Sequence, residues 1–189
     1  ADPVLESWRW RHEEAVEGMG TLCMDKAEDG SLWFGGTGGI TRYDGRTVTS
    51  IRFDDELLSA ITHREEMPWV KALMSTGEGT VLALIGESLV SWSESGWKVI
   101  IQDVGQSVFF NSLVRGKDGS YWLQVREGLW QISRNLEEVS RIIHASRKSR
   151  VMSACIDQQG TVWVVRQITD DEVRLIGIPL KDGRPLAEL

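Results

Sequence analysis

A glycine-rich segment near the start of the chain is the first feature whose residue types suggest chemistry. Four of its glycines lie between residues 35 and 39, inside the segment EDGSLWFGGTGGITRYDG at residues 28–45. Glycine-rich loops bind phosphate when a helix starts directly after them, because backbone N–H groups then converge on the anion. Here the following residues, Ile40 to Asp44, read as a strand, and no Gly-Lys-Ser/Thr is present. We therefore expect a tight turn between two strands, not a phosphate loop.

The three histidines are the candidates for acid–base catalysis, since histidine titrates near neutral pH. His12, His63 and His144 have no partner carboxylate at a readable spacing, and His63 lies in His-Arg-Glu-Glu, which is typical of a solvated loop. The sequence contains no Ser/His/Asp order, no His-x-x-x-His pair and no Cys-x-x-Cys motif, so nucleophilic and zinc chemistry have no visible support. We predict no catalytic residues, no metal and no cofactor.

Composition and charge exclude several classes of function. The net charge of −7 argues against nucleic acid as a partner, because phosphate backbones need a basic face. No apolar run approaches the roughly 20 residues that span a bilayer. The 189 residues include 9 Trp and 19 Gly, and many tight turns together with large flat side chains favour an all-β chain.

The elements that must position any site come from an internal repeat. The segment Gly30-Ser31-Leu32-Trp33 recurs in degenerate form, and each copy begins at an anchor glycine: Gly30, Gly79, Gly119 and Gly160. Short apolar segments precede and follow each anchor, so a unit of about 40 residues holds four short strands. Such small sheets must bury their faces against neighbouring sheets. A β-propeller or propeller segment of about four four-stranded blades fits this pattern better than a β-sandwich, which needs no such repeated anchor.

The predicted boundaries follow from the same alignment. We expect a single β-propeller region over residues 1–189, with blade-like repeats at about 19–53, 70–101, 110–143 and 151–178. Residues 1–18 include an alternating segment that we interpret as an outer strand completing another blade. The repeated tryptophans share one position and are expected, with the anchor glycines, to serve blade structure, the tryptophans packing between blades: Trp33, Trp122 and Trp163.

The best-preserved copy resembles the repeat of the two-component regulator propeller family, D-x-x-G-x-L-W-[IF]-G-T-x-x-G-L-x-R-Y-D. The resemblance runs from about residue 19 to 178, and Leu82 stands in the second copy where the repeat has Trp. It implies the periplasmic, or at least extracytoplasmic, sensor part of a bacterial membrane-bound signalling receptor, attached to the membrane through a part of the receptor outside this chain. Those sensors have many more blades than four.

Three interpretations of the blade number stay open. The chain is a segment of a longer receptor, a closed four-bladed ring, or half of a ring completed by a second copy. In a closed ring, the blades that carry Cys23 and Cys155 would be neighbours, and an oxidising compartment would then allow a disulfide. We favour the simpler interpretation of two buried free thiols.

One face of the predicted propeller is the candidate binding surface. The connections into each innermost strand and the turns between second and third strands line the same face, near the central channel. The alignment places there the ligand-binding candidates, which are Trp69, Arg126, Arg147, Arg150 and Arg166. We predict a non-enzymatic module that senses a small molecule or a protein partner on this face. The alternatives are a propeller lyase with a His base, similar to streptogramin lyase, and a protein-interaction scaffold.

Overall fold

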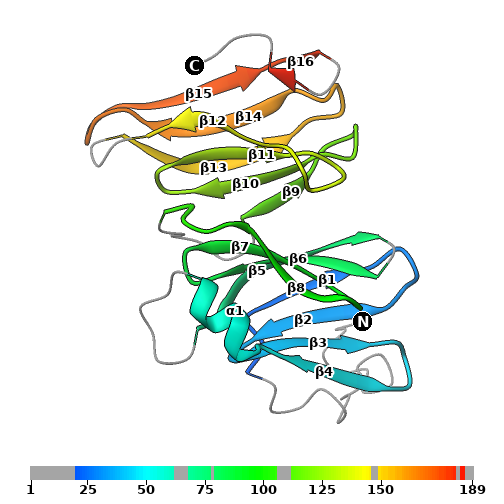
Figure 1. The fold of residues 1–189 in the computed structure, drawn as a ribbon. Helices are drawn as coiled ribbons and strands as arrows, with labels where there is room; N and C mark the ends of the chain where they lie inside the picture. The colour runs from blue at the N-terminus through cyan, green and yellow to red at the C-terminus, as the bar shows by residue number, and fades with distance from the viewer. Residues whose placement is uncertain are drawn as a thin grey trace, which may run out of the picture.

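The computed structural model describes residues 20–61, 68–77, 79–105, 112–145, 149–181 and 184–185. Within these ranges the regular secondary structure is almost all strand, and the strands form four consecutive antiparallel sheets and one short hairpin (Figure 1). Each of the four sheets is a meander, in which every strand pairs with the next strand along the chain. The predicted all-β propeller architecture is therefore observed.

Sheets 1 and 2 each contain four strands. Sheet 1 comprises β1 Cys23–Lys26, β2 Leu32–Gly36, β3 Gly39–Tyr43 and β4 Val48–Arg52. Sheet 2 comprises β5 Val70–Gly77, β6 Thr80–Ile85, β7 Ser88–Ser93 and β8 Gly96–Ile101. Between them lies the helix α1, Asp55–Ala60, which Asp54 caps by accepting a hydrogen bond from the backbone N–H of Leu57 at 2.7 Å.

Sheets 3 and 4 follow in the same pattern, but sheet 4 has three strands. Sheet 3 comprises β9 Leu113–Arg115, β10 Tyr121–Val125, β11 Gly128–Ile132 and β12 Val139–His144. Sheet 4 comprises β13 Arg150–Ile156, β14 Val162–Gln167 and β15 Val173–Ile178. A two-stranded hairpin comes last, formed by β16 Leu180–Lys181 and β17 Arg184–Pro185.

The anchor glycines reverse the chain between the first and second strands of each sheet. All four have a positive φ, between 75° and 86°, which only glycine adopts without strain. In the first turn, the carboxylate of Asp29 accepts hydrogen bonds from the backbone N–H and the hydroxyl of Ser31, which directly precedes β2. In the third turn, Asp118 accepts the same two hydrogen bonds from Ser120, which directly precedes β10. The repeated Asp-Gly-Ser sequence therefore encodes a turn.

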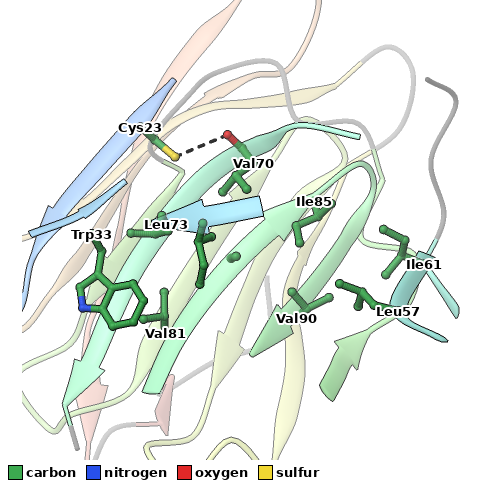
Figure 2. Packing of buried hydrophobic residues seen from close by; sticks show 11 residues of the cluster. Cys23, Trp33, Leu57, Ile61, Val70, Leu73, Val81, Ile85 and Val90 are labelled. Atoms are coloured by element: carbon green, nitrogen blue, oxygen red, sulfur yellow. Dashed lines mark hydrogen bonds between the residues drawn. The ribbon is translucent and has the colours of Figure 1, made fainter. Parts of the chain in front are cut away.

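The hydrophobic core lies between consecutive sheets and not within any one of them. One cluster joins sheet 1 to sheet 2 and α1, a second joins sheet 2 to sheet 3, and a third joins sheet 3 to sheet 4. Figure 2 shows the first cluster, in which Cys23 donates to the carbonyl of Val70 at 3.5 Å. This arrangement explains why short strands are sufficient, since each sheet buries its faces against its neighbours.

The repeated tryptophan position occurs in two environments. Trp33 and Trp122 are 2% and 1% exposed and pack on the following sheet, and Leu82 takes the same role in sheet 2. The ring centroids of Trp33 and Trp92 of sheet 2 are 5.6 Å apart. Trp163 is instead 36% exposed on the outer face of sheet 4, because no following sheet covers it within the described residues. Its packing against another blade stays a prediction.

The sheets follow one another in chain order, with sheet 1 and sheet 4 at opposite ends (Figure 1). Both cysteines are free thiols; Cys23 is buried, whereas Cys155 is exposed. The expectation of two buried thiols is therefore wrong for Cys155, which lies beside Trp163 on the uncovered face of sheet 4.

Candidate functional site

The turn between the second and third strands of one sheet lies against the start of the next sheet's inner strand. In sheet 1, Thr37 of the β2–β3 turn forms an isolated antiparallel bridge with Trp69, which directly precedes β5. In sheet 3, the carbonyl of Arg126 accepts the N–H of Val151 at 3.1 Å. We call the surface formed by these turns and strand starts the loop face. The structure thus gathers on one surface the two kinds of connection that were expected to line it.

Trp69 marks the part of the loop face that lies between sheets 1 and 2. Its side chain is 44% exposed, which is unusual for so large an apolar group. A hollow of about 440 Å³ adjoins the neighbouring turn and extends over the outer face of sheet 1, and its lining includes Phe34, Thr37 and Arg52. Sequence reasoning did not predict this hollow. The signal was the glycine-rich turn itself, because residues without side chains leave space beside Phe34.

The backbones of three of the predicted arginines lie at the junction of sheets 3 and 4, although Arg150 pairs with Gln167 and so lies on the opposite face of sheet 4 from Arg166. Arg126 lies in the β10–β11 turn, Arg150 begins β13, and Arg166 lies near the end of β14. The backbones of Arg126 and Arg166 approach each other because the N–H of Val151 bonds to the carbonyl of Arg126 and Val151 pairs in register with Arg166. Arg147 lies outside the described residues, as does the neighbouring Lys148. Trp69 lies at a different junction, so the predicted residues form two groups.

Hydrogen bonds fix Arg166 within this group. Its Nε donates to the hydroxyl of Ser149 at 3.0 Å, and its Nη2 donates to the carbonyl of His144 at 3.1 Å. Among the described residues, no carboxylate forms a salt bridge with Arg126, Arg150 or Arg166. Within the described part of the chain, these three arginines therefore have no carboxylate partner in a salt bridge, in a protein whose net charge is −7. Such a concentration attracts anions, and guanidinium groups bind carboxylates with two parallel hydrogen bonds.

The histidines give a mixed picture. His12 and His63 lie outside the described residues, while His144 ends β12 with an exposed side chain and its carbonyl bonded to Arg166. Over the described ranges, no group of three or more His, Cys, Asp and Glu side chains is arranged to hold a metal ion. In the same part of the chain, no helix has the length and apolar character needed to cross a membrane.

Comparison with known proteins rests on structure. No protein-family model matches the sequence, and no curated protein is significantly similar to it. The extracellular domain of the hybrid two component system BT4673 of B. thetaiotaomicron is similar to this structure at a TM-score of 0.57 and 15% identity. The match covers 85% of this chain and 21% of that domain. The fold is that of a β-propeller.

Two further propeller structures extend the comparison. The extracellular domain of the hybrid two component system BT3049 of B. thetaiotaomicron has a TM-score of 0.51 at 14% identity, over 89% of this chain and 23% of that domain. Virginiamycin B lyase from Staphylococcus aureus has a TM-score of 0.58 at 13% identity, over 89% of this chain and 59% of the lyase. The chain thus spans about a fifth of the two extracellular domains. One propeller architecture serves both kinds of protein.

Proposed function

We propose that this propeller is a non-enzymatic recognition module of an extracytoplasmic bacterial signalling receptor, and that it binds an anionic ligand or an acidic partner protein on the loop face. The observation that carries the proposal is the group formed by Arg126, Arg150 and Arg166, whose charges no described carboxylate neutralises. The structural similarity to extracellular domains of hybrid two component systems supports the receptor context.

The geometry favours recognition at this junction. The N–H of Val151 and the carbonyl of Arg126 link the two sheets, so a ligand bound across the arginines contacts both. Binding then favours one relative arrangement of neighbouring sheets over another, which is how a module without catalysis passes a signal to an output module. Arg166 is already oriented by two hydrogen bonds, which lowers the entropic cost of binding.

The test uses poly-L-glutamate as an acidic probe and a neutral polymer of equal length as the control. We expect poly-L-glutamate to bind in calorimetry, with an affinity that falls as salt is added. Replacing Arg126 and Arg150 with Gln together should weaken binding at least tenfold. The matched control, Arg46→Gln together with Arg134→Gln, removes the same charge from exposed turns in sheets 1 and 3 and should leave binding within about twofold. Equal weakening in both double variants would refute the proposed site.

A propeller lyase is the second candidate, because virginiamycin B lyase is structurally similar to this chain. His144 supports it to the extent that its backbone lies beside the arginine group. The variant with His12, His63 and His144 all replaced by Ala distinguishes the candidates. The recognition function predicts unchanged poly-L-glutamate binding in this variant. If the unaltered protein instead turns over streptogramin-type substrates and this variant does not, the chain is an enzyme.

A further inference from the structure

Sheets 1 and 4 are the first and last of the four meander sheets in the described residues, and their outer faces are the two halves of a junction that these residues form three times. At each internal junction, a large side chain from the second strand of one sheet packs on the next sheet: Trp33, Leu82 and Trp122. The receiving face offers buried second-strand residues such as Val81 and Ala83 in sheet 2. Sheet 4 presents the first kind of face and sheet 1 presents the second.

The outer face of sheet 4 has exposed apolar side chains, and no other sheet of the described residues covers it. Trp163 takes the place of Trp33 and Trp122 and is 36% exposed, while Val173 and Leu175 of β15 are 56% and 66% exposed. The register places all three side chains on one face of the sheet, since Leu175 pairs with Val165 and Val173 pairs with Gln167. On the opposite face of sheet 4, Val162 and Val164 are fully buried against sheet 3. A contiguous apolar face of this kind marks a contact surface.

The outer face of sheet 1 has a hollow. Met24, Phe34, Thr41 and Ser50 form one row across the sheet, and Met24 is 56% exposed. The hollow of about 440 Å³ lies over the last three residues of this row. Their counterparts in sheet 2 lie under side chains of sheet 1, so the hollow occupies the position where a preceding sheet inserts its side chains.

We infer that the outer face of sheet 4 packs on the outer face of sheet 1 of a second copy, and that two copies close an eight-sheet ring through two such contacts. Leu175 of sheet 4 holds the position that Ile40 holds in sheet 1, since Leu175 pairs with Val165 and Ile40 pairs with Gly35. Ile40 packs on sheet 2, so by analogy Leu175 packs into the hollow beside Phe34 of the other copy. A contact between two different faces gives a closed ring when repeating the rotation that relates the copies leads back to the first copy.

Charge favours the same pairing. The turn between β14 and β15 contains Asp170, Asp171 and Glu172, of which Glu172 is paired with Arg174 at 2.6 Å. At the internal junctions, the corresponding turn lies against the start of the next inner strand. In the second copy that region contains Thr21, which lines the hollow together with Arg52. The acidic turn therefore meets an arginine that forms no salt bridge among the described residues.

Solution mass by light scattering tests the inference. The chain has a mass of 21.2 kDa, and we expect the unaltered protein to have twice this mass. Leu175→Asp should convert the protein to a monomer. At concentrations so low that the unaltered protein is also monomeric, the two melting temperatures should be equal, because the Leu175 side chain is exposed within one chain. Ser140→Asp, at an exposed position of β12 in sheet 3, should remain a dimer. A monomeric unaltered protein, or a mass of more than two copies, would overturn the two-copy ring.

Disulfide trapping tests the register independently of mass. Asp25 of sheet 1 accepts the N–H of Ser75 of sheet 2 at 2.7 Å, which fixes how inner strands meet. Cys155 occupies the place of Asp25, since each pairs with the repeated tryptophan, and Lys26 occupies the place of Ser75. Oxidised Lys26→Cys protein should therefore form a covalent dimer within minutes.

Two controls make the trapping decisive. Lys26→Cys combined with Cys155→Ser lacks the opposing thiol and should stay uncrosslinked. Lys117→Cys, in the exposed β9–β10 turn of sheet 3, should crosslink at least tenfold more slowly. Equal rates for Lys26→Cys and Lys117→Cys would show random collision and contradict the proposed contact.

Discussion

The repeated tryptophan is buried at the junction between sheets 1 and 2 but partly exposed on the outer face of sheet 4. Trp33 is buried against Trp92, whereas Trp163 is 36% exposed and its Nε1 donates to Asp157 at 2.7 Å. The preceding turns are alike, because the anchor glycine before each tryptophan has a φ of 86°. The repeat therefore specifies strands and turns, while the presence of a following sheet decides whether its tryptophan becomes core.

The largest contrast we expect is in thiol reactivity. Burial raises the pKa of Cys23 to about 12, so at pH 8 roughly one molecule in 10⁴ carries the reactive thiolate. Cys155 is exposed on the outer face of sheet 4. In the Leu175→Asp variant, Ellman's reagent should modify one thiol at least a hundredfold faster than the other, and peptide mapping should identify the fast one as Cys155. Similar rates for both thiols in the folded protein would show that the junction opens readily.

The next contrast is in stability. Trp33→Ala leaves a cavity between two sheets and should lower the free energy of unfolding by about 3–5 kcal/mol. Trp163→Ala, made in the Leu175→Asp background so that the outer face contacts water, should lower it by about 1 kcal/mol. Urea denaturation followed by circular dichroism measures both, and Trp122→Ala should match Trp33→Ala. Comparable losses at Trp33 and Trp163 would show that sheet 4 is covered within one chain.

Two glycines extend the comparison to smaller effects. A Cβ at Gly35 would lie 2.5 Å from Val70 Cγ1 and 2.6 Å from the sulfur of Cys23, inside the packed junction. Gly35→Ala should therefore cost about 1–3 kcal/mol through overpacking. At Gly177 the nearest atoms belong to the partly exposed Trp163 ring at 3.0 Å. In the Leu175→Asp background the outer side of this ring contacts water and not a second copy, so Gly177→Ala should change stability there by about 0.5 kcal/mol or less. Urea denaturation measures both losses of stability, and a larger loss for Gly177→Ala than for Gly35→Ala would contradict the prediction.

Most of the fold could be predicted from the sequence because turns and strands are encoded locally. Anchor glycines and Asp-Gly-Ser turns appear directly in the repeat, so strand positions follow from them. The exposure of Trp163 and Cys155 could not be predicted, because it depends on which sheet comes next and the repeat looks the same either way. The hollow beside Phe34 was also missed, since it arises from side chains on three strands that only the folded sheet brings together.

The candidate site was predicted in part for a similar reason. Arg126 lies in a turn and Arg150 begins an inner strand, positions that alignment of the repeats could assign. Arg166 lies within β14 instead of in the following turn, and its bonds to Ser149 and His144 depend on tertiary contacts. Whether these arginines bind a ligand stays a prediction.

The smallest effect concerns pH, and it distinguishes the turns of sheets 1 and 4. The Trp163 indole N–H lowers the pKa of Asp157, with help from backbone N–H groups that include Thr161, while hydrogen bonds from Ser31 lower the pKa of Asp29. A carboxyl group whose pKa is lower in the folded state adds stability above its unfolded pKa of about 3.9, and this stability is lost as pH falls through the folded value. Both turns should therefore weaken in acid.

Removing each tryptophan should separate the two turns. We compare how the free energy of unfolding changes between pH 6 and the most acidic pH at which the protein still folds, at constant ionic strength. Trp163→Ala should reduce this change, because Asp157 loses the main cause of its lowered pKa. Trp33→Ala destabilises far more but should leave the change intact, because Asp29 is held by Ser31 and by Arg42. An unchanged pH dependence in Trp163→Ala would mean that the bond from Trp163 to Asp157 does not stabilise the turn of sheet 4.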